Sequence, residues 1–170
     1  LSIKGWQTLI KNCNNSIPVN VLDKLQPELM KDIQNSFDFV SKFWPHDLPK
    51  GFIHGDLFPD NVFFIDDKIT GVIDFYFSCT DILTYDLAIA INAWCFDKQD
   101  NFQDEKYQAL LKGYNSKRKL SKDEEFFLPL LCKAASLRFL LTRLFDWVNT
   151  PIEANVAVSY THLTLPTMDS

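Results

Sequence analysis

One histidine, two aspartates and one asparagine in the middle of the chain have types and spacings that can support chemistry. Asp56 and Asn61 stand five residues apart, His54 precedes Asp56 by two residues, and Asp74 follows Asn61 by 13. An Asp-x-x-x-x-Asn loop followed by a further aspartate is typical of sites that transfer phosphoryl groups. Such transfer requires a carboxylate near the acceptor hydroxyl and hard oxygen ligands that hold Mg²⁺ against the phosphates. These residues therefore predict a phosphoryl-transfer site with Mg²⁺ close to three oxygen-bearing side chains.

The segment between Asn61 and Asp74 predicts a β-hairpin that brings these two residues together. Two β-rich runs flank the polar residues 66–68, which is a hairpin signal. With the turn centred on Asp67, Asn61 lies six residues before it and Asp74 seven after it, so antiparallel pairing places both at the open end. The loop that holds Asp56 leads into the same end. The alternative interpretation is that Asp56 and Asn61 only cap a turn before the hairpin.

Apolar residues at three- and four-residue steps predict helices around the hairpin, and the fold class is α+β, mainly α, with the hairpin packed among helices. The residues from Ser121 to Glu124 have the form of a capping box at the start of the longest helix. Pro129 is expected to kink that helix or to split off its first two turns. Trp94 is expected to pack in the core. Helices are expected over residues 20–44, from about 80 to 97, 103–114 and 121–148.

Length, charge and cysteine pattern limit the class of protein. A chain of 170 residues suits one domain with its own core, and a net charge of -5 offers no basic surface for nucleic acid. No stretch reaches the roughly 18 apolar residues of a membrane span. The four cysteines have no metal-ligand spacing, and three are expected to be buried free thiols. We therefore expect a cytoplasmic protein that binds neither nucleic acid nor membrane, and the sequence predicts no oligomeric state.

The residues around the motif resemble the aminoglycoside phosphotransferase and choline kinase superfamily, which has a protein-kinase-like fold. The resemblance is carried by GFIHGDLFPDNVFF at 51–64 and GVIDFYFS at 71–78, and by residues 85–94 and 137–147. Within that superfamily the sequence resembles the homoserine kinase family. The resemblance implies a small amino-acid substrate and cofactors ATP and Mg²⁺. The implied reaction is phosphorylation of the side-chain hydroxyl of homoserine, a step toward threonine.

This resemblance also implies roles for five residues. Asp56 is expected to be the catalytic base that takes the proton of the acceptor hydroxyl, and Asn61 and Asp74 are expected to hold Mg²⁺. His54 is expected to anchor the loop rather than to carry protons. Asp86 is expected to hold the catalytic loop through hydrogen bonds. The alternative for Asp86 is a charge placed at the start of a helix, where the helix dipole favours a carboxylate.

Two arginines and one aspartate near the C-terminal end of the longest helix are candidate substrate ligands. Homoserine presents a carboxylate and an ammonium group, so its site should offer an arginine and an acid. Helical spacing places Arg138 and Asp146 on one stripe and Arg143 about 140° away from Arg138. We expect one or both arginines, with Asp146, to bind the amino acid. An ion pair between Arg143 and Asp146 on an exposed face is the open alternative.

The resemblance covers residues 1–155, which we expect to form the C-terminal catalytic lobe of a phosphotransferase without its N-terminal nucleotide-binding lobe. No Gly-x-Gly-x-x-Gly loop is present, so little or no turnover is expected from the isolated chain. Residues 156–170 are expected to form an irregular tail that resembles translated sequencing adaptor rather than native sequence. The alternative functions are a kinase for choline, methylthioribose or an aminoglycoside, and a non-catalytic kinase-like interaction module.

Overall fold

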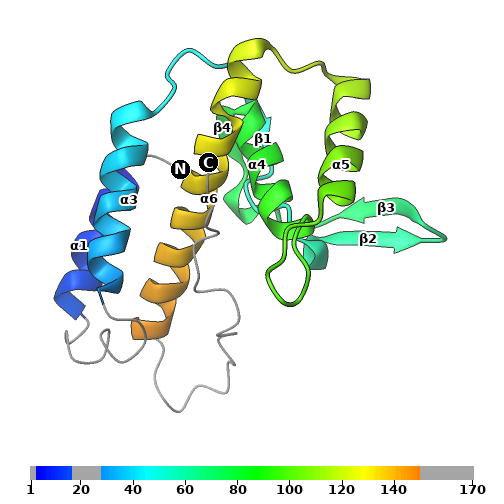
Figure 1. Cartoon of the computed structure of the whole chain (residues 1–170). Coiled ribbons are helices and arrows are strands. Elements are labelled where there is room, and N and C mark those ends of the chain that lie inside the picture. The colour runs from blue at the N-terminus through cyan, green and yellow to red at the C-terminus, as the bar shows by residue number, and fades with distance from the viewer. Residues whose placement is uncertain (1–2, 17–27, 150–170) are drawn as a thin grey trace. The chain divides into compact units, whose positions relative to one another are not determined.

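The computed structural model describes residues 3–16 and 28–149, which belong to two compact units. Unit 1 contains the described residues up to Trp44 and from Ser136 onward, and unit 2 is Pro45–Ala135. The predicted tail at 156–170 lies outside the described residues. In chain order the elements are α1 (Ile3–Ser16), α3 (Leu29–Phe43), β1 (Lys50–Ile53), the 3₁₀ helix η1 (Pro59–Asn61), β2 (Val62–Ile65), β3 (Lys68–Val72), the 3₁₀ helix η2 (Phe75–Phe77), β4 (Cys79–Ile82), α4 (Leu83–Trp94), α5 (Asp104–Lys117) and α6 (Lys122–Asn149) (Figure 1).

The element content confirms the predicted fold class. The described residues contain five α-helices and two antiparallel sheets of two strands each, so the fold is α+β and mainly α. Within the same residues no helix is both long enough and apolar enough to cross a membrane.

In unit 1, helices α1 and α3 lie side by side and bury apolar faces (Figure 1). Helix α1 was not predicted, although its buried residues recur at helical steps. Of the helix expected over 20–44, α3 forms the described part from Leu29, and Glu28 before it has a left-handed φ of 63° that interrupts a helix; residues 20–27 lie outside the described range. The buried residues are Trp6, Ile10 and Cys13 of α1 and Leu29, Ile33, Phe37 and Val40 of α3.

In unit 2, strands β1 and β4 form a short antiparallel sheet that the sequence did not predict. Lys50 pairs with Ile82 and Ile53 pairs with Cys79, and helix α4 follows β4 and packs against β1. The chain leaves this sheet after Ile53 and returns to it at Cys79. Residues 54–78, which contain the motif and the hairpin, therefore start and end at neighbouring points of the sheet.

The predicted hairpin is confirmed as β2 and β3, which project from the other elements of unit 2 (Figure 1). Ile65 pairs with Lys68, and the two residues between them, Asp66 and Asp67, have φ values of 47° and 61°. A two-residue turn with positive φ at both positions matches the right-handed twist of paired strands, and aspartate tolerates this conformation better than most residues. The local sequence thus specifies the turn.

Helices α5 and α6 follow the expected pattern with two differences. Helix α5 continues through Gly113 to Lys117 rather than ending near the glycine. Pro129 lies inside an uninterrupted α6, so the first two turns are not split off as expected. Pro129 and Glu125 are both exposed, so water can bind the Glu125 carbonyl that would otherwise accept from residue 129.

Three cysteines are buried as free thiols, as the sequence predicted. Cys13, Cys95 and Cys132 are each at most 3% exposed, whereas Cys79 is partly exposed. Burial raises the pKa of the Cys13 thiol to about 11 and that of Cys132 to about 12. These thiols are therefore protonated, apolar components of the core at neutral pH.

Candidate active site

The candidate catalytic loop begins where β1 ends, and Asp86 of α4 holds its first two peptide groups. The N–H of His54 donates to Asp86 Oδ2 at 2.7 Å, and the N–H of Gly55 donates to Oδ1 at 2.8 Å. Both carboxylate oxygens thus accept from the loop backbone, and hydrogen bonds to a charged acceptor are stronger than neutral ones. Asp86 also lies in the first turn of α4, so the helix dipole favours its charge as well.

Gly55 allows the loop to lie close to η2. Its φ is +78°, and a Cβ atom built at this position would lie 2.7 Å from the carbonyl oxygen of Phe77. Neighbouring contacts bind the same two segments, since Ser78 Oγ donates to the His54 carbonyl at 3.3 Å. A residue with a side chain would be strained in backbone conformation and would also clash, so this position requires glycine.

His54 is buried, and both of its ring nitrogens are engaged. Nδ1 accepts a hydrogen bond from the Asp56 N–H at 3.2 Å, and Nε2 lies 2.8 Å from the Ile73 carbonyl oxygen. Because a carbonyl only accepts, these partners assign the neutral tautomer with hydrogen on Nε2. The ring also packs against Phe75, with centroids 4.6 Å apart. These contacts tie the loop to the end of the hairpin and support the anchoring role proposed for His54.

Asn61 links the candidate base to the hairpin. Its Nδ2 donates to the Asp56 carbonyl at 2.8 Å and to Asp56 Oδ2 at 3.2 Å. The Phe58 N–H donates to the same Asp56 carbonyl, and the Asn61 N–H donates to the Phe58 carbonyl, so a tight turn carries the chain into η1. Because the amide nitrogen is directed at Asp56, Oδ1 of Asn61 is directed away from it. That oxygen is the atom a metal ion would use.

Asn61 and Asp74 stand at the open end of the hairpin, as its predicted geometry required. The Ile73 N–H donates to the Asn61 carbonyl at 3.0 Å, which extends the ladder past the pair of Val62 and Val72. The register skips Thr70 opposite Phe63 and Phe64, a β-bulge of one residue on β3, so that Ile73 lies opposite Asn61 and Asp74 follows one residue beyond.

Asp74 adopts an uncommon backbone conformation at this open end. It is exposed, with φ 59° and ψ 64°, and its Oδ1 accepts a long hydrogen bond from the Tyr76 N–H at 3.4 Å. Aspartate tolerates the left-handed region better than most non-glycine residues, and residues held in that region are often found at ligand-binding sites.

The donor set at the open end fits Mg²⁺. The protein offers an amide oxygen from Asn61 and a carboxylate from Asp74, and both are hard ligands. Among the described residues no group of three or more His, Cys, Asp or Glu side chains could hold a metal ion. Two protein ligands suit Mg²⁺, which keeps several waters and binds substrate phosphates, better than a structural zinc, which requires four.

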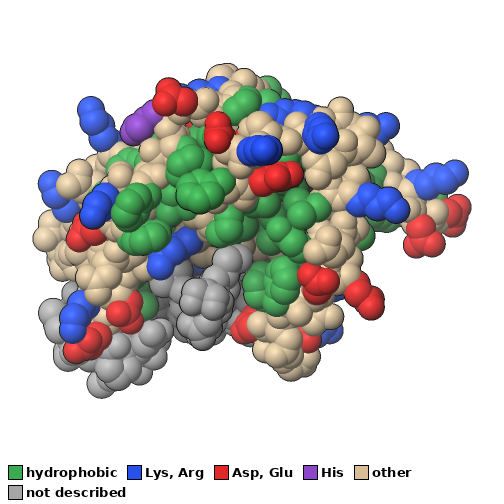
Figure 2. Space-filling view, turned by 45° about the horizontal axis from the view of Figure 1, so that its top comes forward, with side chains coloured by type: hydrophobic (Ala, Val, Ile, Leu, Met, Phe, Trp, Pro, Cys, Tyr) green, Lys and Arg blue, Asp and Glu red, His purple; other side chains and the backbone are tan. Residues whose placement is uncertain are grey.

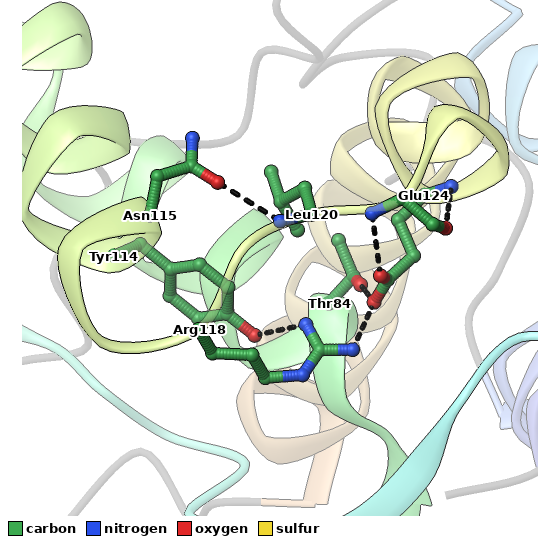
Figure 3. A network of polar contacts seen from close by, with 7 residues as sticks. Thr84, Tyr114, Asn115, Arg118, Leu120 and Glu124 are labelled. Carbon is green, nitrogen blue, oxygen red and sulfur yellow. Dashed lines mark hydrogen bonds and ion pairs between the residues drawn. The ribbon is translucent and has the colours of Figure 1, made fainter.

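A buried polar network holds the first turn of α4, two residues before Asp86 (Figure 3). Glu124 of α6 is 1% exposed, and its Oε1 accepts from Thr84 Oγ1 and from Arg118 Nη2, while Oε2 accepts from the Ser121 N–H. Burial alone would raise the pKa of Glu124, but these hydrogen bonds outweigh it and hold the pKa below its usual range. The capping box was predicted from the sequence, whereas its contacts with Thr84 and Arg118 were not.

The three candidate substrate ligands lie on α6 within unit 1. Arg138 is buried, and its guanidinium lies 4.4 Å from the centroid of the Phe139 ring. Arg143 is partly exposed and Asp146 is exposed. Their role in binding an amino acid stays a prediction.

Trp94 contacts the loop in a way that the sequence did not indicate. Its indole N–H donates to the Leu57 carbonyl at 2.9 Å, whereas the sequence predicted only core packing. Helical periodicity places an aromatic residue on the inner face of α4 but does not specify which polar group its N–H meets.

A helix-supported loop that carries a candidate base, next to a hairpin whose open end lies beside two candidate oxygen ligands, is the arrangement expected in the catalytic region of a phosphotransferase. The chain belongs to the phosphotransferase enzyme family, whose sequence pattern matches residues 2–120. It is 51% identical over 156 residues to the homoserine kinase of Granulibacter bethesdensis, covering 92% of this chain and 47% of that protein. It is similar also to the homoserine kinases of Acidiphilium cryptum (47% identical, 92% and 47% covered) and Rhizobium meliloti (48% identical, 89% and 45% covered). The chain thus spans about half the length of these relatives.

Proposed function

We propose that the chain carries the catalytic loop and the Mg²⁺ ligands of an ATP-dependent kinase that phosphorylates the side-chain hydroxyl of homoserine. The observation that carries this proposal is the position of Asn61, whose amide nitrogen bonds to Asp56 while its backbone pairs with the strand leading to Asp74. Asn61, itself a candidate metal ligand, thereby joins the candidate base to the segment that leads to the other candidate ligand, Asp74. The identity of 51% to a homoserine kinase supports this acceptor over other small alcohols.

Asp56 would act as the catalytic base in this reaction. Its carboxylate receives the proton of the acceptor hydroxyl, and the hydrogen bond from Asn61 to Oδ2 restricts rotation of the group. Asn61 Oδ1 and the Asp74 carboxylate would hold Mg²⁺, which supplies positive charge to the phosphates. The hydrogen bond from Asn61 to Asp56 is formed without substrate, which supports this role because a preorganised base needs less reorganisation at the moment of reaction.

The supporting residues keep the loop rigid during this step. Asp86 bonds to the backbone before Asp56, and His54 connects the Asp56 N–H to the Ile73 carbonyl. Arg138, Arg143 and Asp146 are proposed to bind the carboxylate and ammonium groups of the amino acid. The proposed reaction takes place in the cytoplasm as a step toward threonine.

The proposal is tested by an exchange of segments. Residues 1–155 of this chain replace the matched segment of the Granulibacter bethesdensis homoserine kinase, and ATP-dependent phosphorylation is measured with homoserine and with choline. We expect homoserine to be the better acceptor. Asp56→Asn should lower kcat at least about 100-fold, because a general base contributes about that much or more.

Matched hairpin variants test the metal ligands in the same hybrid enzyme. Asp74→Asn should increase the Mg²⁺ concentration needed for half-maximal activity at least about tenfold. Asp67→Asn is the control, since it makes the same charge change at a left-handed position at the other end of the hairpin. Turnover with choline and not homoserine would support a different acceptor. An inactive hybrid that folds and binds ATP would favour the non-catalytic module.

A further inference from the structure

Helix α4 contacts the catalytic loop at two points, one near each end of the helix. Asp86, in its first turn, bonds to the peptide groups before Asp56, and Trp94, its last residue, bonds to the carbonyl of Leu57 directly after Asp56. Eight residues separate the two contacts, or about 12 Å along a helix. The backbone on both sides of the candidate base is therefore held by a single rigid element.

Trp94 also contacts the hairpin. Its ring packs edge to face with Phe64 of β2, with centroids 6.1 Å apart, while its N–H binds the Leu57 carbonyl at 2.9 Å. Phe64 lies three residues after the candidate metal ligand Asn61. Trp94 thus joins the segment that carries the base to the strand that follows a metal ligand.

A carbonyl group in an irregular segment requires a partner, and here the partner is a side chain rather than a strand or helix. Leu57 lies between β1 and η1, outside any regular element. Leu57 is partly buried, so its carbonyl has restricted access to water, and an indole donor at this point favours the loop conformation in which the two groups meet. Trp94 is only partly buried, so its position is not explained by burial of the ring alone.

We propose that Trp94 is a positioning residue for the phosphoryl transfer. It keeps the Asp56 loop in a fixed position relative to the metal-binding end of the hairpin. This proposal rests on the proposed function. In this proposal the indole N–H fixes the Leu57 carbonyl through a hydrogen bond, which ring packing alone cannot do. Trp94 acts through Leu57 and Phe64 and does not itself touch the reacting atoms.

Two variants of the full 170-residue chain separate positioning from packing. Trp94→Phe keeps an aromatic ring against Phe64 and removes the donor to Leu57. Asn92→Ala is the matched control, because Asn92 Nδ2 also donates to a backbone carbonyl from the same helix, at 2.8 Å, but its acceptor is Cys132 of α6. Hydrogen exchange measured by NMR reports on the loop through the amides of Phe58 and Asn61, which bond within the loop turn.

In Trp94→Phe we expect exchange at Phe58 and Asn61 to become about five- to tenfold faster than in the wild type, after correction for global stability from urea unfolding. Asn92→Ala should leave the corrected rates of these amides unchanged. Equal corrected rates in Trp94→Phe and wild type would overturn the proposal and leave Trp94 as a packing residue.

Mg²⁺ titration of the same proteins, followed by the Asn61 side-chain amide, distinguishes this proposal from the proposed function. We expect apparent affinity to fall several-fold in Trp94→Phe and to stay constant in Asn92→Ala. A wild-type chain in which Mg²⁺ shifts neither Asn61 nor Asp74 would count against the proposed metal site. The exchange rates would still decide whether Trp94 orders the loop.

Discussion

Asp56 and Asp86 both belong to the candidate site, but their hydrogen bonds leave only one of the two carboxylates available to a substrate. The two oxygens of Asp86 accept from the N–H groups of His54 and Gly55, which commits that carboxylate to the backbone. Asp56 accepts from a side-chain amide at Oδ2 and is only partly buried. Such a carboxylate can be approached by a substrate hydroxyl, so Asp56 is the better candidate for the base.

Gly55 gives a prediction that depends on one Cβ atom. Gly55→Ala should lower the free energy of unfolding by about 2 kcal/mol, because alanine at φ +78° is strained and its Cβ meets the Phe77 carbonyl. Urea unfolding measures the change. Gly113→Ala is the control, since a Cβ there meets nothing within 4 Å in the middle of α5. That variant should gain about 0.5–1 kcal/mol, and a loss in both variants would contradict the account.

At the scale of elements, α4 is the part of the fold that determines the geometry of the site. It is buried along most of its length and carries both Asp86 and Trp94. Its first turn is held in turn by the hydrogen bond between Thr84 and Glu124 (Figure 3). The capping box of α6 therefore stabilises not only its own helix but also the element that orders the catalytic loop.

The Glu124 network predicts a pH dependence of stability. Because the pKa of Glu124 is lowered in the folded protein, its contribution is complete above the unfolded pKa of about 4.3 and is lost as pH falls through the folded value. Glu124→Gln should lower the free energy of unfolding by about 1–3 kcal/mol at pH 7. The difference from wild type should shrink as the pH is lowered below 4.

Urea unfolding across this pH range makes the measurement. Asp104→Asn is a suitable control, because Asp104 is an exposed acid in the first turn of a neighbouring helix. A difference between Glu124→Gln and wild type that is independent of pH would show that charge is not the source of the stabilisation.

At the scale of the whole molecule, the hairpin is an exposed apolar feature with charged residues only at its turn. Ile65 and Ile69 are 64% and 65% exposed, and in Figure 2 acidic and basic side chains gather at the projecting end of the hairpin. Each strand of a two-stranded sheet has one free edge, and apolar free edges favour self-association. The exposed surface therefore favours association of the isolated chain at high concentration.

Replacing both residues tests that expectation. Ile65→Thr with Ile69→Thr should reduce self-association in sedimentation experiments, with little change in unfolding, because threonine keeps the β-propensity of the strands. Phe126→Gln is the control, since Phe126 is 77% exposed on α6, away from any strand edge. If Phe126→Gln reduced self-association more than the hairpin variant did, the hairpin would not be the site of association.

The sequence alone determined the local elements and the order of the motif within them. The Asp66-Asp67 turn, the strands beside it and helix α4 follow from periodicity and turn chemistry, because residues two to four apart share a face of their own element. Asp56, Asn61 and Asp74 were identified from the spacing of the motif and from the hairpin predicted between Asn61 and Asp74. The helix expected over 20–44 is interrupted at Glu28, because a left-handed residue leaves no periodic signal in the sequence.

The contacts between these elements could be determined only from the tertiary structure. The pairing of β1 with β4, the contact of Trp94 with Leu57 across 37 residues and that of Thr84 with Glu124 across 40 depend on where distant segments close on each other. Two four-residue strands and single polar side chains carry no periodic signal for such partners. Local sequence therefore specified the candidate base and metal ligands, and long-range packing specified the framework that keeps Asp56 next to Asn61.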